Sequence, residues 1–503
     1  MVSNGFIKKR NKAGEGLTRL ISRAFPMEGR DRWLDYLLIG SIVLVFGWVF
    51  AHQMLKEGIG LIAAVLGFCV VLACMLNPET GLYINLFFCF FVCYFSRLVF
   101  GDYSNVGTVS DILILSTLSG YVIKRISLRG TWREFLSSRV VIWILVLDAY
   151  AAVQLYNPFA HSFQGWYLAF RKSFEVLLLF FISYSVFDSY ARVRRYIIVL
   201  FVSCVIAALY GCVQQWHGLF TFEKIWVMSD DTRYGLIFVG GDFRKFSTMS
   251  DPTAYGIIMG ACALFFMILS LAPQKKWRKR VLGAGVILML LGMSYSGTRT
   301  ANIMIVAGIG MYIMLTANKQ KTWVFAIIAT IIFLGLLYVP IYSNPTLIRF
   351  RTSFMGKNDE SYNTRELSRA MIQPYIRVHP IGGGLGTTGA MGLLYNPGHT
   401  LAGFQTDNGY LQSALEIGWI GLAIICLFFF FTLKAGIRGY FQVTEERLKF
   451  IYAAIIVCLF SFIVAEFAQT AIGQISDEMV FYPLIAIILK LKYFDKSREG
   501  EKA

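Results

Sequence analysis

The chain has 503 residues, of which 56% are hydrophobic and 16% aromatic, and its formal net charge is +17 at pH 7. Repeated apolar runs of about 18 residues or more exclude an ordinary water-soluble protein and predict a polytopic membrane protein. The runs are continuously apolar rather than alternating, so closed helices fit them better than an outer-membrane β-barrel. Basic loops kept on the cytoplasmic side of a membrane explain the positive charge before nucleic acid does, and we expect no nucleic-acid partner.

Hydropathy predicts an all-α transmembrane bundle of about fourteen spans. The apolar run 281–316 is too long for one crossing of about 20 residues, and we interpret it as two helices that turn at 294–298. The predicted spans are 33–52, 55–76, 80–100, 106–124, 139–156, 166–187, 194–216, 247–272, 280–296, 298–316, 322–341, 405–433, 448–470 and 474–492. The chain thus divides into a basic tail with an amphipathic segment (1–32), eleven spans (33–341), a large outer loop (342–404), three spans (405–492) and a C-terminal tail (493–503).

The distribution of Lys and Arg orients these helices. With the N-terminal tail in the cytoplasm, every second connection is basic, and about 32 of the 47 Lys and Arg residues fall on the inner side. We therefore expect both termini in the cytoplasm, and most of the net charge reflects topology. The nine cysteines lie in apolar runs without metal-ligand spacing, so we expect no disulfide, no bound metal and no cofactor.

Basic residues on the outer side are the exceptions to this pattern, and several of them lie at helix ends. Arg299 is the sole charge within 281–316, and an ionised side chain so close to hydrocarbon indicates an internal site or an aqueous cavity. A salt bridge to Glu416 or Glu466 would satisfy it. So would the phosphates of a lipid-linked pyrophosphate, which planar guanidinium groups bind bidentately. The outer basic residues include Arg171, Lys172, Arg244, Lys245, Arg299, Arg365, Arg369 and Arg377.

The large outer loop contains two ordered motifs. The segment NTRELSRAMIQ (363–373) predicts a short amphipathic helix that is capped by Asn363, limited by Pro374, and carries Arg365 and Arg369 on one face. The glycine-rich stretch HPIGGGLGTTG that follows can bring backbone amides close to an anion. It lacks the GK[ST] ending of a nucleotide-binding P-loop, so we reject that interpretation.

A third motif, FQTDNGYLQSALEIGWIGL (404–422), opens the twelfth predicted span. Asp407 and Asn408 stand at the start of the helix, where the dipole stabilises a carboxylate that can accept a hydroxyl proton. Glu416 lies nine positions later, roughly 13.5 Å deeper and on the opposite face, so it cannot share that task without a kink. The alternatives are a plain helix cap for Asp407 and a buried pairing residue for Glu416.

Four segments together resemble the O-antigen ligase and polymerase superfamily, the integral-membrane glycosyltransferases that join or extend undecaprenyl-linked glycans outside the bacterial inner membrane. SGTRTA (296–301) is similar to the family's small-residue motif with an arginine opening a helix, and FSTMSDPTAYG (246–256) to its entry into a helix. The stretch from TRELSR to PIGGGLG resembles the large periplasmic loop, and TDNGYLQSALEIGWIGL the segment that follows it. The likeness covers roughly 246–422 and implies a GT-C-like fold; the N-terminal helices agree only in hydropathy.

The resemblance also implies roles for single residues. Arg299 and Arg365 would hold the lipid pyrophosphate, and Asp407 occupies the position where ligases commonly have a catalytic histidine. An ordinary aspartate, with a pKa of about 3.9, is a weaker base than a histidine near neutral pH. The base is therefore either Asp407 in an environment that raises its pKa or His399 from the same region. The other candidates for contacts with the pyrophosphate or glycan are Arg171, Lys172, Arg369, Asn408, Tyr410, His399 and Glu416.

The implied function is an inverting, metal-independent glycosyltransferase that polymerises undecaprenyl-pyrophosphate-linked oligosaccharide on the periplasmic side of the inner membrane. Its partners would be the lipid-linked donor, a glycan or lipid-linked acceptor, the bilayer and a chain-length regulator. Asp407 and two additional helices favour a polymerase over the alternative, a ligase that transfers glycan to lipid A-core. A lipid-linked-oligosaccharide flippase and a structural scaffold are alternatives from other classes. A transporter fits less well because the chain has no internal repeat and its charged groups gather at one surface.

Overall fold

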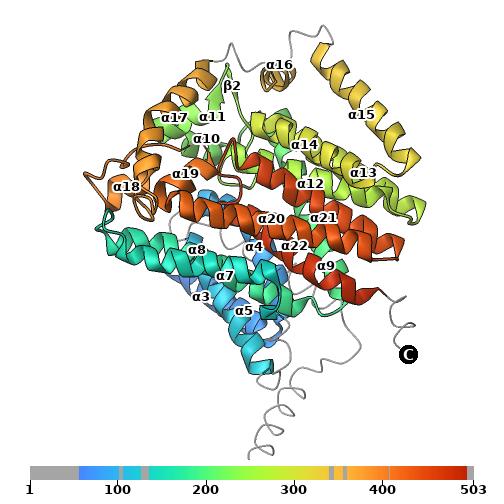
Figure 1. Cartoon of the computed structure of the whole chain (residues 1–503), viewed down its shortest axis with the longest axis horizontal. Coiled ribbons are helices and arrows are strands. Elements are labelled where there is room, and N and C mark those ends of the chain that lie inside the picture. Colours follow the sequence, from blue (N-terminus) through green and yellow to red (C-terminus); the bar gives the residue numbers. More distant parts are fainter. Residues whose placement is uncertain are drawn as a thin grey trace, which may run out of the picture. The chain divides into compact units, whose positions relative to one another are not determined.

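The fold is described from a computed structural model, and its described part is almost entirely helical (Figure 1). Within that part, the short strands β1 (Phe238–Val239) and β2 (Asp242–Phe243) form the sole sheet, an antiparallel ribbon. The prediction of an all-α membrane protein is confirmed at this level. The structure describes residues 56–100, 106–125, 135–338, 345–354, 360–406 and 408–495.

The chain forms two compact units, residues 1–68 and 69–503. Of the first unit the structure describes only the beginning of α3 (Lys56–Leu76), and the predicted span 33–52 lies outside the described residues. Everything that follows concerns the second unit.

The long helices coincide with the predicted spans to within a few residues at most ends, and the exception at 405–433 is described below. Eight of the described helices are long and apolar enough to cross a membrane. The long helices are α4 (Pro78–Phe100), α5 (Val106–Arg125), α7 (Arg139–Val153), α8 (Phe163–Val186), α9 (Tyr190–Trp216), α12 (Pro252–Leu271), α13 (Lys276–Ser296), α14 (Arg299–Thr316), α15 (Gln320–Tyr338), α20 (Gly418–Gln442), α21 (Glu446–Ala465) and α22 (Ile475–Leu491).

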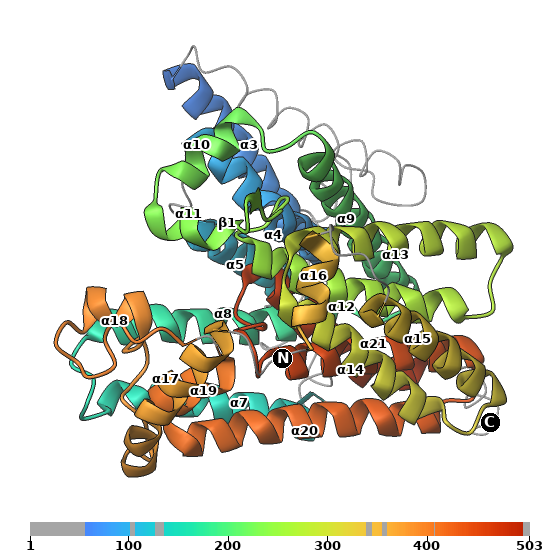
Figure 2. The same ribbon diagram turned by 90° about the horizontal axis from the view of Figure 1, so that it is seen from above.

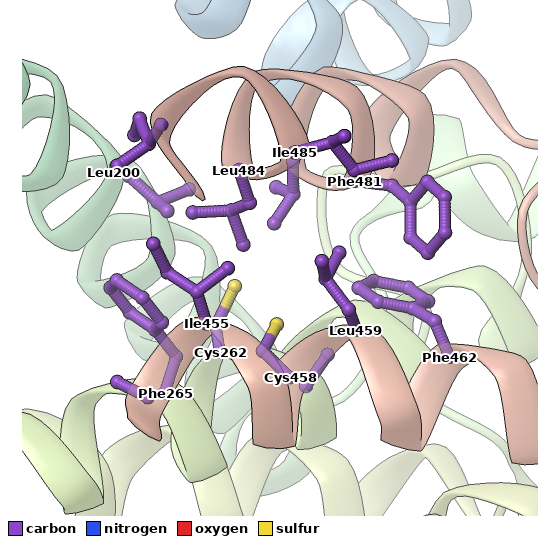
Figure 3. Packing of buried hydrophobic residues seen from close by; sticks show 14 of the residues in the cluster. Leu200, Cys262, Phe265, Ile455, Cys458, Leu459, Phe462, Phe481, Leu484 and Ile485 are labelled. Carbon is purple, nitrogen blue, oxygen red and sulfur yellow. The ribbon is translucent and has the colours of Figure 1, made fainter. Parts of the chain in front are cut away.

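Helices α12 and α21 form the centre of the second unit. α12 packs against α13, α14 and α21, and α21 packs against α14, α20 and α22. Both helices are apolar on all sides, which is typical of helices enclosed by others. Their core with α9 and α22 is shown in Figure 3, where the labelled side chains are Leu200, Cys262, Phe265, Ile455, Cys458, Leu459, Phe462, Phe481, Leu484 and Ile485.

The apolar run 281–316 forms two helices, as predicted. α13 ends at Ser296, and Gly297 caps it in the left-handed conformation with a φ of 61°. Thr298 is the N-cap residue of α14, so Arg299 is the first residue of that helix. The hairpin therefore presents its single charge at the turn rather than within the apolar helices.

The predicted span 405–433 is wrong as one continuous helix. The segment forms α19 (Gly409–Glu416) and then α20, which begins at Gly418 with a φ of 72°. A Cβ at residue 418 would lie 2.0 Å from the carbonyl oxygen of Pro380. The chain breaks here because the glycine-rich loop packs directly against its backbone, a tertiary contact that hydropathy does not contain.

The helix predicted at 363–373 is also longer than expected. α17 spans Glu360–Val378, so Asn363 lies inside the helix instead of capping it, and Pro374 is accommodated within the last two turns. A proline costs a helix one backbone hydrogen bond and crowds the preceding turn, and near a helix end this bends the helix without stopping it.

The short elements gather at one end of the long helices. Figure 2 shows α10, α11, α17, α18 and α19 on the left, whereas the C-terminal end of α20 lies on the right. These short elements build the surroundings of the candidate site. Their bounds are η1 (Gln154–Tyr156), α10 (Thr221–Met228), α11 (Asp231–Ile237), α16 (Pro345–Thr352) and α18 (Gly389–Tyr395), and η3 (Lys492–Phe494) closes the opposite end.

Replacement of Gly418 by alanine is expected to destabilise the protein, because the left-handed conformation alone costs alanine about 1–2 kcal/mol and the new Cβ would collide with Pro380. Thermal unfolding of the purified protein in detergent measures the loss. Gly310→Ala is the matched control: Gly310 lies within α14, and a Cβ there would meet no atom within 4 Å. Equal unfolding midpoints for the two variants would contradict the prediction.

Candidate functional site

A cavity of about 500 Å³ opens where the α13–α14 turn meets the start of α12 and the loop between α21 and α22. Three arginines line it, and they come from three separate stretches of the chain. The polar lining residues on which the argument depends are Arg244, Arg299, Arg349, Asp251, Gln405 and Gln474.

Arg244 is fixed in this wall by neutral oxygen atoms. Its Nε donates to the Ser296 carbonyl oxygen at 2.9 Å and its Nη2 donates to Thr298 Oγ1 at 3.1 Å. Burial lowers the pKa of Arg244 to about 10; the charges of Arg349 and Arg299 act in the same direction, and Asp251 opposes them. The guanidinium stays protonated at neutral pH. Its surroundings disfavour the positive charge, so a bound anion would stabilise it.

Arg349 reaches the same cavity from α16. Its Nη2 donates to the carbonyl oxygen of Val239 in the β-ribbon. Burial lowers the pKa of Arg349, and the carboxylate of Asp242 partly offsets this effect. A Cβ on Gly297 would lie 2.4 Å from Nη1 of Arg349, so the glycine that ends α13 also leaves room for this guanidinium.

Arg299 completes the group at the first turn of α14. Its side chain is exposed, and its charge contributes to the lowered pKa of Arg244. The start of a helix adds partial positive charge from unsatisfied backbone N–H groups. Arg299 lines the cavity together with Arg244 and Arg349.

A buried arginine anchors the segment that enters α12. Arg97, 2% exposed, donates to the carbonyl oxygens of Met249 at 2.7 Å and Ser247 at 2.6 Å. Its guanidinium lies 5.0 Å from the ring centre of Trp226 and 4.6 Å from that of Phe246. Ser247 has a φ of 51°, a left-handed conformation that a non-glycine residue holds only when its surroundings fix it.

This anchoring sets the position of Asp251, which also lines the cavity. One carboxylate oxygen of Asp251 accepts hydrogen bonds from the amides of Thr253 at 2.8 Å and Ala254 at 3.0 Å, and so caps α12. Sequence analysis missed Arg97, although the signal was present: like Arg299, it is a lone arginine inside an apolar run.

The glycine-rich loop uses its amides inside the protein, which corrects the prediction of an external anion site. The Gly383 amide donates to the Leu415 carbonyl oxygen at 2.7 Å and the Gly384 amide to that of Glu416 at 2.8 Å. The carboxylate of Glu416 accepts from the Thr388 hydroxyl and from the Gly386 amide. The loop therefore uses these amides and the Thr388 hydroxyl to bind the α19 segment, including the buried Glu416, whose pKa is raised by burial.

The loop between α21 and α22 brings neutral polar groups to the cavity, among them Gln474. Glu466 accepts hydrogen bonds from the amides of Ala471 at 2.8 Å and Ile472 at 2.9 Å. Lys172 donates to the Gly473 carbonyl oxygen and lies 3.7 Å from a carboxylate oxygen of Glu478. Lys172 thus holds the loop in place beside the cavity.

Other predicted site residues have contacts outside the cavity. Arg171 pairs with Asp111 at 3.1 Å. The guanidinium of Arg369 lies 5.3 Å from the ring centre of Phe467. Asp407 and the side chain of Arg365 fall outside the described residues.

The start of α19 agrees with the prediction of a helix beginning at Asp407 and Asn408. The side chain of Asn408 caps α19 by accepting from the amides of Tyr410 at 2.9 Å and Leu411 at 3.2 Å. The Tyr410 hydroxyl donates to the Ile463 carbonyl oxygen at 2.9 Å and ties α19 to α21. Gln405, three residues before the cap, lines the arginine cavity.

His399 lies in the glycine-rich region. Its Nδ1 accepts a hydrogen bond from the amide of Leu401 at 3.1 Å. Burial lowers the pKa of His399, and the neighbouring His161 and His379 lower it further. The imidazole is therefore neutral at pH 7, and because Nδ1 accepts from Leu401, its proton lies on Nε2; His399 would have to give up this hydrogen bond to accept a proton.

Comparison with known proteins adds one decisive match: residues 284–426 fit the family described as O-antigen ligase. This match supports the resemblance to the O-antigen ligase and polymerase superfamily over residues 284–426. No curated protein sequence matches the chain. The apolar helices described above agree with the membrane setting of this family. The matched region contains Arg299, Arg349 and the glycine-rich loop, whereas Arg244 and Asp251 precede it.

Arg97→Met is expected to lower the free energy of unfolding by about 3 kcal/mol, because two buried carbonyl oxygens lose charge-assisted hydrogen bonds. The thermal midpoint in detergent measures the effect. Arg280→Met removes the same charge from an exposed position on α13 and should leave the midpoint within error. An unchanged midpoint for the Arg97 variant would show that the anchor contributes no stability.

Proposed function

We propose that this protein is a membrane glycosyltransferase that extends a glycan carried on undecaprenyl pyrophosphate, at the outer face of the bacterial inner membrane. The observation that carries the proposal is the convergence of Arg244, Arg299 and Arg349 on one cavity. Guanidinium groups bind phosphate oxygens bidentately, and a pyrophosphate offers enough oxygens for several of them. Arg365, on the neighbouring outer loop, is a further candidate contact.

The chemistry required is a displacement at the anomeric carbon of the donor glycan. An acceptor sugar hydroxyl forms the new glycosidic bond, the bond from the anomeric carbon to the pyrophosphate oxygen breaks, and undecaprenyl pyrophosphate leaves with the electron pair. Direct attack inverts the anomeric centre. The arginines stabilise the charge that develops on the leaving group, a role that elsewhere falls to a divalent cation, so we infer a metal-independent reaction.

The hydroxyl proton goes to Asp407 in this proposal, with His399 as the alternative base. Asp407 is two residues after Gln405, which lines the arginine cavity. Asp407 stands where ligases of the superfamily commonly have a histidine, and this favours a polymerase over transfer to lipid A-core.

The orientation follows from the distribution of basic residues. The ends of α20, α21 and α22 that lie away from the cavity carry Lys434, Arg438, Lys449 and Lys490. Loops rich in Lys and Arg are retained in the cytoplasm, which supports a periplasmic position for the cavity in this proposal. A glycan carried on undecaprenyl pyrophosphate at that face would have its lipid tail in the bilayer and its pyrophosphate at the cavity.

Alanine at Arg244, Arg299 or Arg349 is expected to lower the rate of glycan transfer about a hundredfold or more, because each removes a preorganised donor to the leaving group. The assay follows the consumption of lipid-linked oligosaccharide and the product length with purified protein in detergent. Arg377→Ala, an exposed arginine on α17, is the control and should keep the wild-type rate.

The same assay separates a transferase from a flippase. Detergent micelles have no second compartment, so a flippase leaves the lipid-linked glycan unconsumed. Wild-type product lengths in all three cavity variants would remove these arginines from the mechanism.

The identity of the base is expected to appear in the pH dependence of transfer. Asp407→Asn should abolish transfer, whereas His399→Gln should retain it, with a rate that changes little between pH 6 and 8. If His399 is the base, the histidine variant fails instead, and the wild-type rate falls as the pH drops through the lowered pKa of His399, because the protonated imidazole cannot accept the proton.

A further inference from the structure

A second cavity, of about 320 Å³, lies at the other end of α21 and α22. The start of α7, the last turns of α20, and η3 contribute to its walls. The twenty-residue helix α21 runs from this cavity toward the loop at the arginine cavity. At 1.5 Å per residue this is roughly 30 Å, about the thickness of the hydrocarbon core of a bilayer. The two cavities therefore lie at opposite membrane surfaces.

The wall of the second cavity is strongly cationic. Arg139, Lys434, Arg438 and Lys492 line it, and no Asp or Glu is among its described lining residues. Across the described part of the chain, no carboxylate lies within 4 Å of these four side chains. Asp495, nearby in the sequence, accepts hydrogen bonds from the Thr444 amide and hydroxyl instead. Among the residues that the structure describes, the lining of this cavity thus carries four positive charges and no carboxylate.

Aromatic rings hold several of these cations in position. The guanidinium of Arg139 lies 5.8 Å from the ring centre of Phe431, and Lys434 Nζ lies 5.8 Å from the same ring. Lys490, on the adjoining turn of α22, lies 3.9 Å from the ring centre of Tyr184. Cation–π contacts orient a cation but leave its net charge in place.

A close helix contact shapes the floor of this cavity. Gly439 lines it on α20, and a Cβ there would lie 2.4 Å from the ring of Tyr452 on α21. Tyr452 donates from its hydroxyl to the Ile488 carbonyl oxygen at 3.0 Å, which fixes α21 to α22. The floor is therefore rigid, while the cationic side chains Arg139, Arg438 and Lys492 are exposed at the mouth.

We propose that this cavity binds the phosphate headgroup of an anionic phospholipid. Apolar side chains continue from the cationic wall along α20: Phe431 lines the cavity, and the adjoining Phe430 is 54% exposed and Leu427 37%. An acyl chain can lie along this surface while the phosphate meets Lys434 and Arg438. A soluble phosphate would use the charges alone and gain nothing from the apolar strip. Basic pockets between membrane helices at a bilayer surface suit anionic headgroups for this reason.

The test titrates delipidated full-length protein in detergent with phosphatidylglycerol, phosphatidylcholine or inorganic pyrophosphate, and counts bound molecules by native mass spectrometry. We expect one retained phosphatidylglycerol. The double variant Lys434→Gln/Arg438→Gln should weaken its binding about thirtyfold. Each basic residue near an anionic lipid strengthens binding roughly fivefold, and the variant removes two of them. The matched control Lys276→Gln/Arg280→Gln removes two exposed charges from α13, outside the cavity, and should leave binding unchanged.

Three results would overturn the proposal. Equal weakening in both double variants would assign the effect to general surface charge. Equal binding of phosphatidylcholine would show that the apolar strip acts without the cations. Binding of pyrophosphate as tight as that of phosphatidylglycerol would make this a site for a soluble anion. Gel filtration confirms that each variant is folded, and because the readout is bound lipid, the result does not depend on glycan transfer.

Discussion

The structure at the end of the bundle that holds the arginine cavity depends on keeping three permanent cations together in a partly buried space. Like charges a few ångströms apart repel by roughly 2–4 kcal/mol at an effective dielectric constant of about 20. The protein meets part of this cost with neutral oxygens: carbonyl groups of Ser296 and Val239 and the hydroxyl of Thr298 accept from the guanidinium groups. Such acceptors orient a guanidinium but do not cancel its charge. Among the described lining residues, three guanidinium groups share the cavity with one carboxylate, that of Asp251.

Carboxylates at this end serve mainly the backbone. Asp251 caps α12, Glu466 binds two amides of its own loop, and Glu416 binds the glycine-rich loop. Each acid fixes a segment that borders the cavity or supports its wall. These hydrogen bonds hold the loops in one conformation, which hydropathy alone does not predict. Arg97 likewise fixes the segment that enters α12, by donating hydrogen bonds to the carbonyl oxygens of Ser247 and Met249. The ion pairs Arg171–Asp111 and Lys172–Glu478 involve residues that do not line the arginine cavity.

Features that depend on local composition could be predicted from the sequence. Apolar runs predicted the long helices, and the length of 281–316 predicted a hairpin with Arg299 at its turn, because a span has a fixed length. Features set by contacts between distant segments were not predictable. The break at Gly418 requires the loop at Pro380, and the grouping of Arg244 with Arg349 requires the β-ribbon to meet α16. The glycine-rich loop was recognised as an amide donor, but its acceptor, Glu416, lies elsewhere in the sequence.

The two ends of the bundle use positive charge in different ways. At the arginine cavity all three cations are guanidinium groups, which suit bidentate recognition of one bound group, and Arg244 and Arg349 are held by hydrogen bonds to backbone oxygens. At the opposite cavity lysine and arginine are mixed, three of the four cationic side chains are exposed, and aromatic rings rather than carbonyl groups orient several of them. A count of basic residues does not distinguish the two ends by chemistry and predicts only the orientation of the helices in the membrane. The groups that surround each cation distinguish the two ends: fixed oxygen acceptors suit the pyrophosphate that we propose for the arginine cavity, and aromatic rings beside an apolar strip suit the phospholipid headgroup that we propose for the other.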